Sequence, residues 1–231
     1  MTSRTQSNSS GFTRIELAAV VTALILLLTV IAPMLAAGRH ATEQATCTGN
    51  LRQLGQAWQS WLTVNGELPW QLPASAGGIN TTVQVQNSYR SFQYLTNELP
   101  TPANLVCPAD TETVMRATNW ALLDTSYYRG NALSYTVGTD SFASLPLSLL
   151  SSDRNFVGFE RQICAVGTWT LTLQSGNAAI GWNTNTIHGD SGNVLRVDGS
   201  VNAYSSAQLR EYLAIPETDP NNGRHHTLPP R

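Results

Sequence analysis

The stretch that decides the fold is GFTRIELAAVVTALILLLTVIAPMLAA, residues 11–37. From Leu17 to Ala37 it contains no charged side chain. At about 1.5 Å of rise per residue, an α-helix over that run is roughly 30 Å long, which matches the hydrocarbon core of a bilayer. The sequence therefore predicts a membrane-spanning helix near the N-terminus.

The residues that flank this run indicate its orientation. Those before it are polar or small, and their positive charges are Arg4 and Arg14. Because positively charged flanks stay on the cytoplasmic side, we expect a cytoplasmic N-terminus. This predicts a single-pass protein of the inner (cytoplasmic) membrane whose head domain is periplasmic or extracellular.

Glu16 lies at the start of the apolar run and is a candidate functional residue. A charge inside a membrane costs several kcal/mol unless it is paired, so a plain anchor gains nothing from it. A purely local role is the alternative, because the positive end of the helix dipole favours a carboxylate in the first turn.

The string GFTRIEL, residues 11–17, resembles the processing signature of type IV prepilins and type II secretion pseudopilins. The resemblance implies that a prepilin peptidase cuts between Gly11 and Phe12 and methylates the new N-terminal Phe12. Glu16 is then the fifth residue of the mature chain. Its carboxylate would neutralise the free amine of a neighbouring subunit as helices bundle in a filament, which offsets the cost of burial.

Two other fates of the segment stay open, an uncleaved signal anchor and a conventional signal peptide. Leu35-Ala36-Ala37 has small residues suited to cleavage after Ala37. However, the apolar run exceeds the roughly 7 to 15 residues usual in signal peptides. Each fate predicts a different mature N-terminus.

Beyond Gly38 apolar residues recur every three or four positions, at Cys47, Leu51, Leu54, Trp58 and Trp61. That spacing predicts an amphipathic continuation of the helix to about Val64. Its apolar stripe needs a partner, which in pilins is an antiparallel sheet. We therefore expect an α+β fold, with a long N-terminal membrane-spanning helix packed at its C-terminal half on an antiparallel β-sheet head.

Local patterns predict the elements of the head. They are a short helix near Tyr89–Leu99, an alternating strand over Val166–Leu173, a hairpin of 193–197 with 200–204 around Asp198-Gly199, and a helix over Ser206–Leu213. The resulting organisation is a leader at 1–11, a membrane and filament-core helix at 12–38, its amphipathic continuation at 39–64, a globular head at 65–215 and a disordered tail at 216–231.

A second motif lies near the C-terminus, where nine residues separate His188 from Asp198-Gly199. It resembles the H-X9-DG motif of a family of prepilin-processed proteins common in planctomycete-like bacteria. Other strings match that family in the same order: Cys47 with Asn50–Gly55, Cys107–Asp110, Ser126–Asn131 and Ser152–Asn155.

The motif residues have a structural and a functional interpretation. Structurally, His188 lies at the base of two hairpins and Asp198-Gly199 makes a turn. Functionally, related pseudopilins bind calcium in this region, and Asp190 and Asp198 would be the first candidate ligands for Ca²⁺. Gly189-Asp190-Ser191-Gly192 also mimics the nucleophile turn of trypsin-like proteases, but the base and orienting residues of that family are absent.

The chain contains three cysteines, Cys47, Cys107 and Cys164. One disulfide with one leftover thiol, in any of three pairings, and three unpaired buried thiols are both compatible with the sequence. Cys47 and Cys107 both lie in family-like strings, so the resemblance favours their pairing. A disulfide requires an oxidising compartment, as the predicted export provides.

Composition limits the classes of function. Charged residues make up 12% of the chain and the net charge is -2, so nucleic acid is not an expected partner.

We expect that the chain is not an enzyme and has no certain cofactor. The resemblance implies a structural pseudopilin that partners prepilin peptidase, itself, other pilin-like subunits and an assembly ATPase in a type II secretion or pilus-like filament. The alternative is a membrane-anchored binding module, for example for polysaccharide, with Trp70, Trp120 and Trp182 as an aromatic platform.

Overall fold

The computed structural model describes residues 13–78, 88–112, 115–163, 169–218 and 224–228. Their fold is α+β, with one N-terminal apolar helix and an antiparallel sheet. The chain divides into two compact units, Met1–Thr42 and Glu43–Arg231, so the division falls four residues beyond the predicted boundary at 38.

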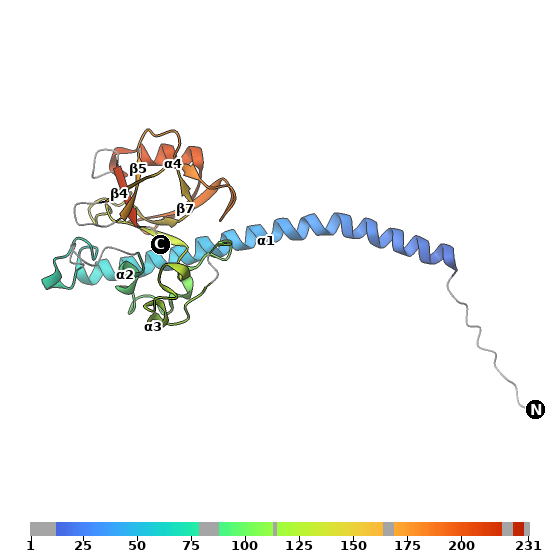
Figure 1. The fold of residues 1–231 in the computed structure, drawn as a ribbon, viewed down its shortest axis with the longest axis horizontal. Helices are drawn as coiled ribbons and strands as arrows, with labels where there is room; N and C mark the ends of the chain where they lie inside the picture. Colours follow the sequence, from blue (N-terminus) through green and yellow to red (C-terminus); the bar gives the residue numbers. More distant parts are fainter. Residues whose placement is uncertain (1–12, 79–87, 113–114, 164–168, 219–223, 229–231) are drawn as a thin grey trace, which may run out of the picture. The chain divides into compact units, whose positions relative to one another are not determined.

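The helix α1 runs from Arg14 to Asn65 (Figure 1). Its segment Arg14–Ala32 has a mean hydropathy of 2.6 and is the one helix, among the described residues, that is long and apolar enough to cross a membrane. None of this segment is buried. Consecutive side chains from Leu24 to Leu28 are all exposed, so its apolar surface faces outward on every side.

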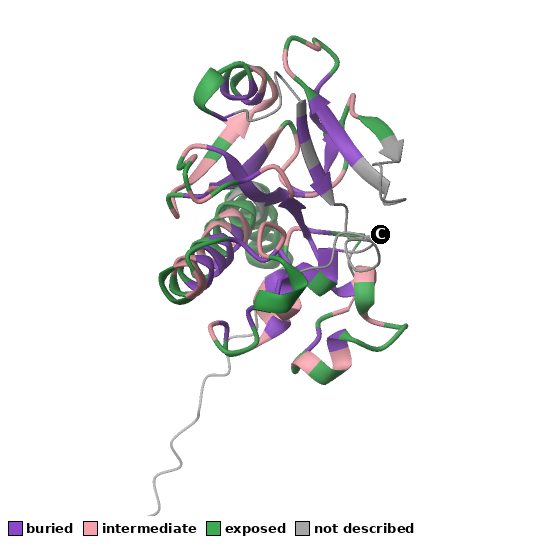
Figure 2. Ribbon diagram, turned by 90° about the vertical axis from the view of Figure 1, so that its left-hand side faces the viewer, coloured by how far each residue is buried: buried purple, intermediate pink, exposed green. Residues whose placement is uncertain are grey.

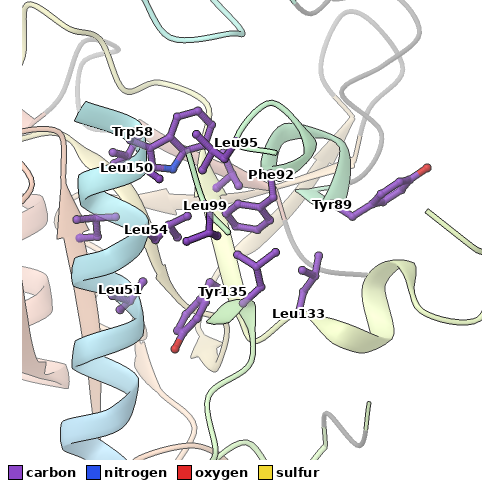
Figure 3. Packing of buried hydrophobic residues seen from close by; sticks show 14 of the residues in the cluster. Leu51, Leu54, Trp58, Tyr89, Phe92, Leu95, Leu99, Leu133, Tyr135 and Leu150 are labelled. Carbon is purple, nitrogen blue, oxygen red and sulfur yellow. The ribbon is translucent and has the colours of Figure 1, made fainter. Parts of the chain in front are cut away.

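The C-terminal half of α1 is amphipathic, as its spacing predicts. Cys47, Leu51, Leu54 and Trp58 are at most 1% exposed, and Trp61 packs against the same core at its edge. Figure 3 shows Leu51, Leu54 and Trp58 facing a cluster that includes Phe92, Leu99 and Tyr135. The predicted apolar stripe is therefore confirmed.

The head is built on a seven-stranded sheet in which every pairing is antiparallel. In spatial order its strands are β4 (Glu160–Ile163), β5 (Trp169–Gln174), β9 (Arg224–Leu228), β1 (Tyr135–Gly138), β2 (Leu149–Asp153), β7 (Ser191–Arg196) and β8 (Val201–Ser205). A separate two-stranded sheet pairs β3 (Phe156–Val157) with β6 (Gly181–Trp182).

Both faces of the main sheet are covered. Adjacent residues of a strand point to opposite faces. Accordingly, Leu150 and Leu195 belong to the core that contains the buried stripe of α1, whereas Leu149 and Val194 belong to a second core with α4 (Ser206–Leu213). Figure 2 shows buried residues concentrated in the strands between these layers. This double coverage explains why all five residues of β2 are buried.

Shorter elements complete the head: α2 (Ser88–Gln93), α3 (Trp120–Leu123) and the 3-10 turns Ala74–Ala76, Pro102–Leu105, Arg129–Ala132 and Pro216–Thr218. The helix predicted near Tyr89–Leu99 is shorter than expected. After Gln93 most of the backbone bonds span three residues, as in Leu95 N to Phe92 O at 2.9 Å, so the chain continues in tight turns toward Pro100.

Two further predictions about the head are confirmed. The hairpin around Asp198-Gly199 is β7 and β8, with Leu195 opposite Val201. The final helix is α4, whose capping box joins Ser205 and Gln208. The predicted strand Val166–Leu173 is β5 from Trp169 onward, and its first residues lie outside the described ranges.

The prediction of a disordered tail over 216–231 is wrong for its described residues. Arg224–Leu228 forms β9, an inner strand between β5 and β1, and His225 is only 3% exposed. The segment lacks the apolar alternation that would predict a strand. It is held in the sheet by backbone pairing on both sides. Hydrogen bonding of this kind leaves little trace in side-chain hydropathy.

Candidate functional site

The H-X9-DG motif flanks one inner strand of the sheet. His188 lies in the loop before β7, and Asp198-Gly199 forms the turn after it. Gly189 has a φ of 66°, a backbone conformation that favours glycine, and its N–H donates to Ile187 O at 2.8 Å. The loop is closed by Ser191 Oγ, which donates to His188 O at 2.9 Å.

His188 is directed at a disulfide. Cys47 of α1 and Cys107 are joined, and both are fully buried. His188 Nε2 lies 3.4 Å from Cys107 Sγ, and its side chain is 5% exposed. The disulfide and His188 therefore bring together α1, the loop after Pro102–Leu105 and the motif loop.

Asp153, the last residue of β2, completes this buried group. Its Oδ2 lies 3.8 Å from His188 Nε2 and accepts hydrogen bonds from Asn193 N at 2.7 Å and Asn193 Nδ2 at 2.9 Å. Thr48 Oγ1 of α1 donates a hydrogen bond to Asn193 Oδ1 at 3.1 Å. Asp153 Oδ1 has no hydrogen-bond partner among the described residues.

Burial determines the charge of this group. It raises the pKa of Asp153 to about 7, with a smaller contribution from Asp110, although the hydrogen bonds from Asn193 act the other way. Burial also lowers the pKa of His188, and the negative charge of Glu43 offsets part of that effect. Below neutral pH the carboxyl is therefore mainly protonated and the contact is not a strong ion pair.

A charged pair lies beside this group. Arg154 binds Asp110 through two hydrogen bonds, of 2.7 and 2.8 Å, and reaches Glu112 at 3.2 Å. The Asp110 side chain is fully buried, so the bidentate contact compensates its charge. The strings Cys107–Asp110 and Ser152–Asn155, which lie apart in the sequence, thus meet around His188 and the disulfide.

The other end of the motif contacts α1 about two turns further on. Gln59 Nε2 donates to Val197 O, and a Cβ on Gly55 would lie 2.8 Å from Leu195 Cδ1 and 3.3 Å from Gly199 O. Gly199 has a φ of 82°. From Cys47 to Gly55 the helix advances about 12 Å, so the motif holds α1 to the sheet at two separated points.

Asp198 is hydrogen-bonded within its own turn, whereas Asp190 is hydrogen-bonded to the start of α4. Asp198 Oδ1 accepts from Ser200 N at 2.9 Å and from Ser200 Oγ, whereas Asp190 Oδ1 accepts from Ser206 Oγ. The strand β7 lies between the two carboxylates, and its six residues extend over roughly 20 Å. Asp190 and Asp198 therefore cannot bind one Ca²⁺ together, contrary to the expectation from the sequence.

The protease-like string has no nucleophile pair. Ser191 Oγ donates to the backbone carbonyl of His188, whereas the His188 ring faces Cys107. A serine nucleophile needs its hydroxyl on the ring nitrogen of a histidine. The described geometry of these two residues does not provide that contact.

The three tryptophans considered for a binding platform are not exposed. Trp182 is 2% exposed and stacks on Phe156, with ring centroids 4.7 Å apart. Trp70 and Trp120 are half-buried against the core and donate to Ser141 O and Leu99 O.

The head also has a cavity of about 290 Å³, lined in part by Arg154, Asn155, Phe159 and Arg161.

At the N-terminal end, Gly11 and Phe12 lie outside the described residues. Glu16 occupies the first turn of α1, where Oε2 accepts from Thr13 N and Thr13 Oγ1, both at 2.8 Å. Glu16 N in turn donates to Thr13 Oγ1 at 3.3 Å. This reciprocal cap was not predicted, although T-x-x-E is a known signal for it.

Comparison with known proteins gives no match to a family model, to a curated protein or to a solved structure. The function of the chain therefore has to be inferred from its own residues, their motifs and their geometry.

Proposed function

We propose that the chain is a structural, pilin-like subunit, cut between Gly11 and Phe12 and methylated there, that assembles into a type II secretion or pilus-like filament. The observation that carries the proposal is α1 itself. One helix contains the end of the predicted processing motif, from Arg14 to Leu17, an apolar segment without a buried residue, and a second half that packs in the core of the head.

The bare apolar segment supports lateral assembly. Side chains such as Leu24 and Leu28 are 52% and 63% exposed, and apolar side chains are exposed around the whole helix. A surface of this kind is stable only in lipid or against other helices. Before assembly the inner membrane would provide the first environment, and neighbouring subunits would provide the second.

The attachment of α1 to the head supports a mechanical role. The Cys47–Cys107 disulfide joins the helix to the loop after Pro102–Leu105, and the Gly55 contact packs it against Leu195 of the sheet. A force applied along packed helices would therefore move the heads with them. No nucleotide-binding motif occurs in the sequence, so the energy would come from an assembly ATPase acting through partner proteins.

Glu16 allows a sharp test, because its charge and its capping contact can be separated. Glu16→Gln keeps an oxygen that can cap Thr13 but removes the charge, whereas Glu16→Ala removes both. The readout is disulfide crosslinking between Leu24→Cys chains in membranes that contain prepilin peptidase, in a Cys164→Ser background. We expect disulfide-linked dimers with Glu16 and their loss with both substitutions.

Two results would overturn parts of the proposal. If the Gln chain crosslinks as well as the Glu16 chain and only the Ala chain fails, then Glu16 is a helix cap and not an assembly charge. If no Leu24→Cys chain crosslinks in any background, then the apolar segments do not bundle and the chain is not a filament subunit.

A further inference from the structure

The buried group around His188 contains the side chains of a metal site. Cys47 Sγ, Cys107 Sγ and His188 Nε2 all lie within 4.8 Å of one another. Among the residues that the structure describes, this is the one group of three or more such side chains with this spacing. The Asp153 carboxylate, at 3.8 Å from His188 Nε2, adds a fourth ligand type.

The separations resemble those of tetrahedral zinc. With Zn–S near 2.3 Å and Zn–N and Zn–O near 2.1 Å, tetrahedral angles place sulfur and nitrogen about 3.6 Å apart and nitrogen and oxygen about 3.4 Å apart. Here Cys107 Sγ and His188 Nε2 are 3.4 Å apart, and His188 Nε2 and Asp153 Oδ2 are 3.8 Å apart. The two sulfurs, which are joined in the disulfide, would have to separate to about 3.8 Å.

We propose that reduction of the Cys47–Cys107 disulfide creates a zinc site with the ligands Cys47, Cys107, His188 and Asp153. A dithiol reductant supplies two electrons and two protons, so that it becomes a disulfide while the two cysteines become thiols. Binding of Zn²⁺ then releases both thiol protons and any proton on the Asp153 carboxyl, so the three anionic ligands exceed the charge of the ion by one. Reoxidation by a disulfide reverses the exchange and expels the metal.

The surroundings of Asp153 provide independent support. Its Oδ1 is buried without a hydrogen-bond partner among the described residues, an arrangement that costs free energy. Oδ2 is held by the two donors of Asn193. Coordination through both carboxylate oxygens would satisfy Oδ1 and leave Asn193 to orient the carboxylate, as outer residues do around metal ligands.

The zinc site and the disulfide would hold the same segments together. In both states α1 is tied to the loop that contains Cys107, and zinc would add the motif loop through His188 and β2 through Asp153. The head would thus keep a covalent or coordinate crosslink to α1 in either redox state. This inference does not depend on filament assembly.

The test uses the full chain in detergent, with Cys164→Ser in every sample so that only two thiols titrate. Oxidised and reduced chains are titrated with Zn²⁺ against a chelator, and with Co²⁺ as a spectroscopic probe. We expect one Zn²⁺ per reduced chain and none per oxidised chain. We also expect Co²⁺ to show thiolate charge transfer and the intense visible bands of tetrahedral coordination.

Single substitutions assign the ligands. His188→Gln and Asp153→Asn should each weaken binding by the order of 10-fold to 100-fold, whereas the matched control His40→Gln, on an exposed part of α1, should not. Equal binding by oxidised and reduced chains, or equal effects of His188→Gln and His40→Gln, would overturn the proposal. So would a reduced chain that loses its fold and is not refolded by Zn²⁺.

Discussion

Removal of the disulfide should destabilise the head strongly. Cys47 and Cys107 are 60 residues apart in sequence, and closing a loop of that length in the unfolded chain corresponds to about 4 kcal/mol of stability. Both side chains are fully buried, so Cys47→Ala/Cys107→Ala opens a small cavity and also removes the sulfur that contacts His188 Nε2. For a domain of this size we expect the melting temperature to fall by roughly 8 to 16 °C.

Tryptophan fluorescence during urea unfolding measures this loss. All six tryptophans lie beyond Thr42, so the signal reports the head and not the apolar segment. The experiment is done with chelator present, to exclude crosslinking by metal. Reductant serves as the control, since it should lower the wild-type stability to that of the variant and leave the variant unchanged. A loss below about 1 kcal/mol would refute the idea that this bond stabilises the attachment of α1 to the head.

Two further predictions concern the contacts of α1 and the buried carboxyl. Gly55→Leu should destabilise the head by about 1 to 3 kcal/mol in the same urea titration, because its Cβ would meet Leu195. The control Gly49→Leu has open space around its Cβ and should be neutral or stabilise by about 0.5 to 1 kcal/mol. Equal effects of the two substitutions would contradict the close packing at Gly55. The pKa of Asp153 in the folded chain, about 7, exceeds its ordinary value of 3.8. Between these pH values the folded chain therefore binds one more proton than the unfolded chain. The free energy of unfolding should fall as pH rises from about 4 to 7, by up to about 1.4 kcal/mol per pH unit. Asp153→Asn should lack this component, and identical pH slopes for the two chains would show that the carboxyl does not titrate as described.

Elements with a strong local signal were predictable from the sequence. The stripe from Cys47 to Trp61 has a helical period, and Asp198-Gly199 between two apolar runs indicates a hairpin. The strand Arg224–Leu228 was not predictable, because its position in the sheet depends on backbone bonds to β5 and β1 that are distant in sequence. Side-chain hydropathy does not record such bonds.

The candidate site was likewise predictable from the sequence only in part. The motif marked His188, but its position against Cys107 and Asp153 depends on the joining of three distant segments. The expectation that Asp190 and Asp198 share a cation failed because proximity in sequence is not proximity in space when an extended strand intervenes. The string Ser152–Asn155 marked the segment that contains Asp153, but it did not show that this carboxyl is buried, because residues distant in sequence surround it.

Mass spectrometry of the N-terminus of the membrane-extracted protein tests the central claim most directly. Expression together with a prepilin peptidase should yield a mature chain that begins at methylated Phe12. The control is Gly11→Ala, which alters the residue before the predicted cut and should leave the leader attached. A wild-type chain that begins at Met1, as in a plain anchor, or at Gly38, as after a signal peptide, would contradict the account.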